Sequence, residues 1–150
     1  MQTVYLWFPG NAAEALRFYQ GVFGGRLALH TFADFGRDDG PAEAIAHGVL
    51  SGPVELYATD ATPREATLEM RGISIALLGA ADPATSTHWF AELAVGGEVL
   101  DDLKERGWGA SDGQLVDRYG VRWLIGFEQG AGDENDENAA SNGSGVSNQR

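Results

Sequence analysis

Hydrophobic and polar positions along the chain predict two β-α-β-β-β units. The first unit opens with Thr3–Phe8, which is β-branched and aromatic, so we expect a strand that is apolar on both faces. Apolar residues then recur at helical spacing from Ala12 to Phe23 and stop at Gly24-Gly25, which predicts a helix. Three further strands are expected over Arg26–Phe32, Ala42–Leu50 and Val54–Thr59.

The second unit repeats this order after a linker near residues 61–71. A strand is expected over Gly72–Leu78, and Asp82-Pro83 has the order of an N-cap acid followed by proline at the first helical position. In the first unit, Asn11 is the expected helix cap, with Glu14 as the acid of a capping box. The second helix is expected to end at a second double glycine, Gly96-Gly97. Three strands are expected after it: one that begins at Glu98, one over Trp108–Val116 and one over Val121–Phe127.

The two units superimpose along the sequence at a spacing near 72. When Gly24-Gly25 is placed on Gly96-Gly97, Phe18 falls on Phe90 and Leu27 falls on Val99. A shared element order at constant spacing indicates an internal repeat. We therefore expect an α+β domain over 1–127, with modules at about 3–60 and 72–127. Two four-stranded sheets side by side would form a curved, half-open, eight-stranded barrel whose concave side makes a ligand pocket.

Charge and composition narrow the classes of function. The 150 residues include 22 acidic and 10 basic side chains, a formal charge of -12, and Lys104 is the one lysine. This balance argues against a nucleic-acid binder and against docking on an anionic membrane. Cysteine is absent, which excludes disulfides, thiol catalysis and Cys-ligated metal centres. The sequence has no apolar run of the ~18 residues that a membrane span requires and no recognisable secretory signal. We therefore expect a cytoplasmic protein.

The last residues differ from the rest in composition. Residues 128–150 carry five acidic side chains and one large apolar residue, Val146. Such a stretch buries too little apolar surface to offset its ordering entropy, so we expect a disordered acidic tail.

Several of these segments resemble a known family. YLWFPGNAAEALRFYQGVFGGRL is similar to the start of the PhnB-like branch of the vicinal oxygen chelate superfamily, which includes glyoxalase I, extradiol dioxygenases and bleomycin-binding proteins. In the second half, Trp108-Gly109 and Asp117–Trp123 resemble the Trp-Gly and Asp-x-Phe-Gly-Val-x-Trp signatures of that branch. The resemblance covers about Thr3–Phe127 and implies the glyoxalase/bleomycin resistance-like fold. It leaves function open, because function belongs to sites rather than to folds.

The resemblance also implies where a metal would bind. Metal-dependent relatives hold one divalent ion with His and carboxylate side chains from the first and last strand of each module. Those four positions fall within about one residue of Val4, Glu55, Ile73 and Leu124, and a one-residue slip brings in Tyr5, Ser74 or Trp123. Only Glu55 can ligate, whereas three protein ligands are usual at a catalytic ion. We therefore expect no catalytic metal here.

His47 is the histidine with a possible role in a site. The family often has His-Ala-Glu-Leu where this chain has His47-Gly48-Val49-Leu50, so the histidine is present and the acid is replaced by valine. His47 lies across the expected strand ladder from Glu55 or Tyr57. It is either a proton carrier or ligand donor tuned by Glu55, or a pocket-lining side chain satisfied by that acid. His30 and His88 are expected to be structural.

Two hypotheses follow. The first is a homodimeric protein that binds a small, partly aromatic or apolar molecule in the cup, without a catalytic metal. The second is a metal-dependent lyase, dioxygenase or transferase that holds a divalent metal with a rearranged ligand set, in which Glu55 and His47 are also the candidate catalytic residues. Aromatic side chains can stack on planar ligands, although each can equally fill a core or a dimer seam. The candidate ligand-binding residues are Tyr5, Trp7, His47, Glu55, Tyr57, Trp108 and Trp123.

Overall fold

A computed structural model describes residues 1–129, so the expected tail from 130 onwards lies outside the described residues. The first module consists of β1 (Val4–Phe8), α1 (Ala12–Phe23), β2 (Arg26–Thr31), a short 3-10 helix η1 (Ala33–Phe35), β3 (Ile45–Ser51) and β4 (Leu56–Asp60). The second consists of β5 (Ile75–Leu78), α2 (Pro83–Ala94), β6 (Glu98–Glu105), β7 (Ala110–Val116) and β8 (Arg122–Glu128). Glu128, expected in the tail, is thus the last residue of a strand.

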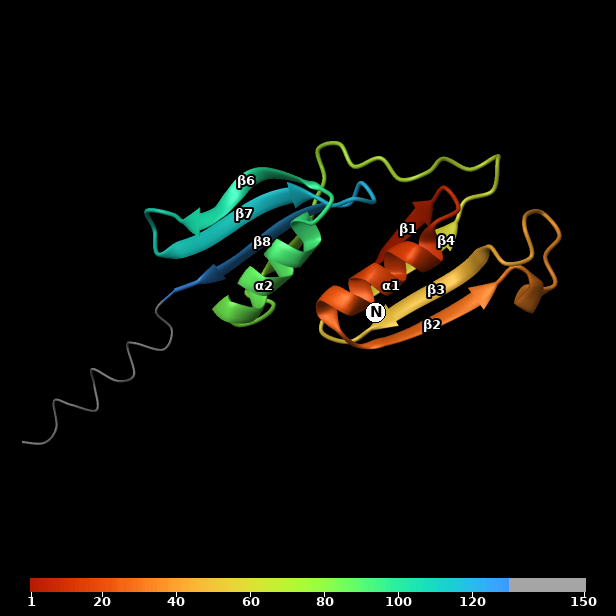
Figure 1. Cartoon of the computed structure of the whole chain (residues 1–150), viewed down its shortest axis with the longest axis horizontal. Coiled ribbons are helices and arrows are strands. Elements are labelled where there is room, and N and C mark those ends of the chain that lie inside the picture. The colour runs from red at the N-terminus through yellow and green to blue at the C-terminus, as the bar shows by residue number, and fades with distance from the viewer. Residues whose placement is uncertain (130–150) are drawn as a thin grey trace, which may run out of the picture.

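Each module forms a four-stranded mixed sheet, which confirms the two β-α-β-β-β units. Sheet A has the strand order β1-β4-β3-β2, and sheet B has the order β5-β8-β7-β6 (Figure 1). In both sheets the first strand pairs in parallel with the last strand of its module, and the other pairs are antiparallel. Within residues 1–129, no strand pair joins sheet A to sheet B.

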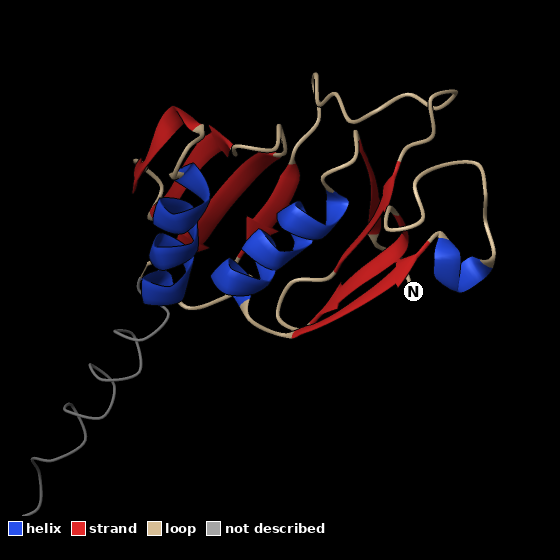
Figure 2. Ribbon diagram, turned by 45° about the vertical axis from the view of Figure 1, so that its right-hand side comes forward, coloured by secondary structure: helices blue, strands red, loops and turns tan. Residues whose placement is uncertain are grey.

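The two helices lie beside each other on the same side of the sheets (Figures 1 and 2). Phe23 of α1 packs at 5.1 Å between ring centres from Trp89 of α2 and at 5.4 Å from Trp123 of β8. One hydrophobic core therefore serves both modules. The face of each sheet that points away from its helix has no helix against it, and we call it the helix-free face.

Asp117, at the β7–β8 turn, holds this shared core together with four hydrogen bonds. One carboxylate oxygen accepts from the Tyr19 hydroxyl at 2.6 Å and from the Trp123 indole at 2.9 Å. The other accepts from the backbone N–H groups of Tyr119 and Val121 at 2.8 and 3.1 Å. Since Tyr19 belongs to α1 and Trp123 to β8, this buried carboxylate joins the two modules.

The two helices begin in different ways. As expected, the Asp82 side chain accepts a hydrogen bond from Thr85 N at 2.7 Å and caps α2. The expected capping box at Asn11 and Glu14 is wrong, because the Asn11 side chain makes no capping bond. The buried carboxylate of Asp60, at the end of β4, accepts instead from Ala12 N at 2.9 Å and also from Ile45 N at 2.8 Å. A long-range acceptor has thus taken the role assigned to a local one.

A double glycine follows each helix, directly after α1 and one residue after the end of α2, and allows the same close approach in each module. Gly24 and Gly96 have φ of +73° and +75°, which side-chain-bearing residues adopt rarely. A Cβ atom on Gly25 would collide with the carbonyl oxygen of Ser51, and one on Gly97 would collide with that of Val116. The expected spacing of 72 therefore reflects a real structural equivalence.

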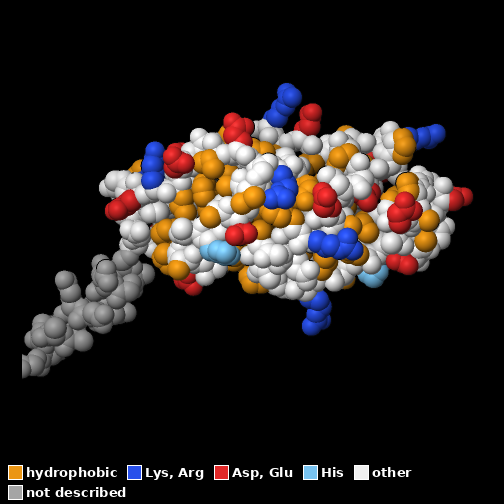
Figure 3. Space-filling model, viewed as in Figure 1, with side chains coloured by type: hydrophobic (Ala, Val, Ile, Leu, Met, Phe, Trp, Pro, Cys, Tyr) orange, Lys and Arg blue, Asp and Glu red, His pale blue; other side chains and the backbone are white. Residues whose placement is uncertain are grey.

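The surface of the described region is mixed in character. On the face shown in Figure 3, Lys and Arg side chains lie apart from one another, interspersed with acidic ones. Among residues 1–129, no helix is long and apolar enough to cross a membrane.

Candidate functional site

The helix-free face of sheet A carries most of the candidate residues. In β1, Leu6 and Phe8 are buried toward the core, and strand alternation turns Tyr5 and Trp7 to the opposite face. Tyr5 lies beside Tyr57 in the parallel β1–β4 register. His47 is two residues before Val49, the antiparallel partner of Tyr57, so its ring points to the same face. Four rings from three adjacent strands thus gather on one surface.

These rings form a contiguous cluster that we call the aromatic face: Tyr5, Trp7, His47 and Tyr57. Tyr5 is at its centre, with ring centres at 4.7 Å from Trp7, 5.7 Å from His47 and 6.4 Å from Tyr57. The Tyr5 and Tyr57 rings are nearly perpendicular at 81°, whereas Tyr5 and Trp7 are tilted by 46°. Trp7 is 38% exposed, and the other three are partly buried. The cluster is therefore reachable from solvent and presents ring faces at several inclinations.

Hydrogen bonds fix three of these rings through their polar atoms. The Tyr5 hydroxyl and His47 Nδ1 are 3.0 Å apart. The Tyr57 hydroxyl donates to a carboxylate oxygen of Glu55 at 3.1 Å. Burial raises the pKa of Tyr5, and the hydrogen bond to Glu55 raises the pKa of Tyr57, so both phenols stay protonated at neutral pH.

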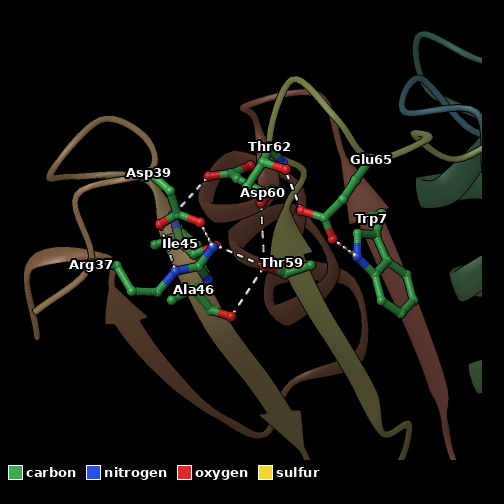
Figure 4. Close-up of polar contacts among 9 residues, drawn as sticks. All are labelled: Trp7, Arg37, Asp39, Ile45, Ala46, Thr59, Asp60, Thr62 and Glu65. Carbon is green, nitrogen blue, oxygen red and sulfur yellow. Dashed lines mark hydrogen bonds and ion pairs between the residues drawn. The ribbon is translucent and has the colours of Figure 1, made fainter. Parts of the chain in front are cut away.

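Trp7 is fixed by a residue that sequence reasoning missed. Its indole N–H donates to one carboxylate oxygen of Glu65 at 3.1 Å, and the other oxygen accepts from the backbone N–H of Thr62 at 3.0 Å (Figure 4). The hydrogen bond from Thr62 lowers the pKa of Glu65, and the bond from Trp7 acts in the same direction. Glu65 lies in the linker, 58 residues from Trp7, where no local pattern marks it as part of a site.

A cavity of about 540 Å³ adjoins the aromatic face at the end of β1 and β4. Its lining includes Phe32, Glu43, Asp60 and Glu65, so it shares Glu65 with the clamp on Trp7. The guanidinium carbon of Arg37 lies 3.9 Å from the centre of the Phe32 ring. Arg37 also forms two hydrogen bonds to Asp39 (Figure 4). The guanidinium group of Arg37 is therefore already paired with a carboxylate.

The two remaining candidates lie away from the aromatic face. Trp108 is 74% exposed in the β6–β7 turn and lines a second cavity, of about 480 Å³, in the other module. Trp123 is completely buried on the helix side of sheet B, where Asp117 accepts from its indole. Trp123 is thus a core residue and does not line a solvent-reachable pocket in this structure.

Comparisons with known proteins place this fold. The crystal structure of protein PA1353 from Pseudomonas aeruginosa is 34% identical to the chain, with a TM-score of 0.71 over 87% of this chain and 100% of that one. A glyoxalase/bleomycin resistance protein/dioxygenase from Nocardioides shares the fold at a TM-score of 0.54 and 16% identity, over 87% of this chain and 84% of that one. The chain belongs to the glyoxalase/bleomycin resistance/dioxygenase superfamily.

Two further proteins are similar to this superfamily member over most of its length. Protein YjdN from Escherichia coli is 26% identical over 135 residues, which are 81% of this chain and 90% of YjdN. The PhnB protein from Bacillus cereus is 22% identical, with a TM-score of 0.66 over 84% of this chain and 98% of that one. No protein-family model matches the sequence.

The strand registers show which side chains occupy the positions where metal-dependent members hold their ion. Val4 lies beside the buried Leu56, so Tyr5, not Val4, shares the helix-free face with Glu55. In sheet B the pair Ala76 and Leu124 occupies that face, because their neighbours Ile75 and Trp123 point into the core. Glu55 is still the one carboxylate at these positions.

His47 and Glu55 have separate partners. His47 bonds to Tyr5, and Glu55 bonds to Tyr57. Among residues 1–129, no three His, Asp or Glu side chains are grouped closely enough to hold a metal ion. The side chains present therefore do not fit the divalent ion of the metal-dependent members.

Proposed function

We propose that this superfamily member binds a small, partly aromatic or apolar molecule on the aromatic face of sheet A, without a catalytic metal. The observation that carries the proposal is the cluster of four solvent-reachable rings where the metal-dependent members need ligands. Planar molecules stack on such rings, and offset or edge contacts with them contribute beyond the area that they bury.

Titration of a planar probe against matched tryptophan variants tests this function. Quinoline is added to the wild-type protein, and the dissociation constant is measured by calorimetry. We expect Trp7→Leu to weaken binding roughly three- to tenfold, the effect of losing one stacking contact. Trp108→Leu serves as the control, because it removes an even more exposed indole from the other module. Equal losses in both variants would contradict the assignment to the aromatic face.

The metal-dependent alternative has its own test. His47 and Glu55 would have to leave Tyr5 and Tyr57 to share an ion, and at least one further ligand would be needed. The purified protein is analysed for bound divalent metals and by thermal unfolding with each metal added. One tightly held ion per chain, with a metal-dependent rise in Tm that His47→Ala abolishes, would overturn the proposal in favour of a metalloenzyme.

We also propose that the protein is a homodimer, as expected from the sequence. In its support, Leu78 and Trp108 are 60% and 74% exposed and line the same cavity of sheet B. Clusters of exposed apolar side chains mark interaction surfaces in proteins. Sedimentation velocity distinguishes a monomer of 16.0 kDa from a particle of twice that mass, and a monomer at all accessible concentrations contradicts this part of the proposal. A cytoplasmic location stays a prediction.

A further inference from the structure

The charges around the aromatic face carry an inference about the ligand. Two of its rings are hydrogen-bonded at their polar atoms by carboxylates: Trp7 by Glu65 and Tyr57 by Glu55. A ring N–H or O–H that donates to an anion shifts electron density onto the ring, so the π-face becomes more negative. Negative ring faces attract cations, and tryptophan does so most strongly.

The carboxylates themselves add to this attraction because Arg37, whose positive charge acts on Tyr5 and Glu65, is already paired with an acid. Arg37 is bound by Asp39 through two hydrogen bonds of 2.9 and 2.6 Å and is stacked on Phe32. The pair is close to neutral, so Glu55 and Glu65 leave a local excess of negative charge. His47 is occupied by Tyr5 through Nδ1, and His30 is at 5.8 Å from the Phe35 ring.

The ring geometry favours a particular kind of cation. The Tyr5, Trp7 and Tyr57 rings present faces at different inclinations, with 46° and 81° between Tyr5 and its two neighbours. Ring faces of this kind suit a carbon-covered charge better than a small hydrated ion, whose water shell they cannot replace. Trp7, at 38% exposure, supplies an open face for a planar group.

We infer that the ligand of the aromatic face is an organic cation whose charge is carried by an alkylated or aromatic nitrogen. This inference rests on the proposed function, since it concerns the ligand of the same surface. It further states that neutral molecules of the same shape bind more weakly and that anionic ones are rejected. The net charge of -12 for the whole chain acts in the same direction at long range.

Three probes of nearly equal shape test the inference at mildly alkaline pH, where quinoline is neutral. The probes are N-methylquinolinium, quinoline and quinoline-2-carboxylate, and calorimetry gives the affinity of each. We expect N-methylquinolinium to bind about fivefold more tightly than quinoline, the upper end of what one exposed cation–π contact supplies. The carboxylate should bind more weakly than either.

Charge-removing variants locate the effect. Glu55→Gln keeps an oxygen that can accept from Tyr57 while it removes the negative charge, and Glu65→Gln removes the other charge. We expect each to reduce the ratio of N-methylquinolinium affinity to quinoline affinity at least twofold. Glu92→Gln is the matched control, because this exposed residue of α2 changes the net charge equally away from sheet A.

The possible outcomes separate the two proposals. Equal affinity for quinoline and N-methylquinolinium, or a preference that survives both substitutions, would overturn the inference while the binding function stands. Tighter binding of the carboxylate would overturn it as well. If none of the three probes binds at millimolar concentration, both proposals fail together.

Discussion

Replacement of Asp117 by asparagine should strongly destabilise the protein. Each oxygen of this buried carboxylate accepts two hydrogen bonds, from Tyr19 and Trp123 on one side and from two backbone N–H groups on the other. An asparagine side chain offers one oxygen and one NH2 group, so in either orientation two donors face another donor. The Tyr19 hydroxyl can rotate to accept from the new NH2 group, but the Trp123 indole cannot, because it only donates.

The expected cost follows from these contacts. A buried donor without an acceptor costs about 1–3 kcal/mol, and hydrogen bonds to charged groups are at the upper end. With one or two donors orphaned, Asp117→Asn should lower the free energy of unfolding by about 2–4 kcal/mol. That is a large part of the roughly 5–15 kcal/mol that keeps a domain folded. Tyr19→Phe, which leaves Asp117 three of its four bonds, should cost about 1–2 kcal/mol.

Urea unfolding, followed by tryptophan fluorescence and by far-UV circular dichroism, measures these losses. The midpoint should fall while the slope stays constant, and the double variant should show a coupling between Tyr19 and Asp117. Asp102→Asn removes the same charge from an exposed position of β6 and should change stability by no more than about 0.5 kcal/mol. If Asp117→Asn also costs less than about 0.5 kcal/mol, the carboxylate does not hold the modules together and the reasoning is refuted.

Three further predictions concern pH and helix capping. Burial raises the pKa of Tyr19 above its ordinary value of 10.0, so the stability that the protonated hydroxyl contributes is complete below pH 10.0 and is lost as pH rises through the higher folded value. Tyr19→Phe should therefore flatten the fall in urea midpoint between neutral and alkaline pH, and an unchanged fall would count against this. The pKa of Glu65 is lowered from 4.5, so its hydrogen bond to Trp7 persists above that pH and is released as pH falls through the lower folded value. The chemical shift of the Trp7 indole N–H should therefore titrate with a midpoint below 4.5, and a midpoint at or above 4.5 would contradict the hydrogen bond. Asp60→Ala should lower the free energy of unfolding by about 2–4 kcal/mol because two buried backbone donors lose their acceptor, whereas Asn11→Ala should lower it by less than about 0.5 kcal/mol. Urea unfolding measures both losses, and a larger loss for Asn11→Ala would show that Asn11 caps α1 after all.

The sequence was sufficient for the modules and their helices because those depend on local pattern. Helical spacing, the Asp82-Pro83 start and the paired double glycines each act within a few residues, and all are present in the structure. The aromatic face was only partly predictable. In a strand that is apolar on both faces, such as Thr3–Phe8, periodicity does not show which side chains meet the helix.

Long-range contacts account for what the sequence did not reveal. Trp123 is in the core because Asp117 and Tyr19 meet it there, and Trp7 is held by a linker carboxylate that is distant in sequence. Asp60 replaces Asn11 as a cap for the same reason. Such partners are chosen by tertiary packing, and no single segment encodes them.

The two helix caps differ in how much of the chain must be folded before each can form. α2 carries Asp82 directly before it, so its first turn can be completed as soon as that segment is synthesised. The cap of α1 depends on Asp60, which is 48 residues after Ala12 and can accept its hydrogen bond only when β4 is in place. Since the same carboxylate also holds the amide of Ile45, the Ala12 and Ile45 amides should become protected from hydrogen exchange in one step, late in the assembly of the first module.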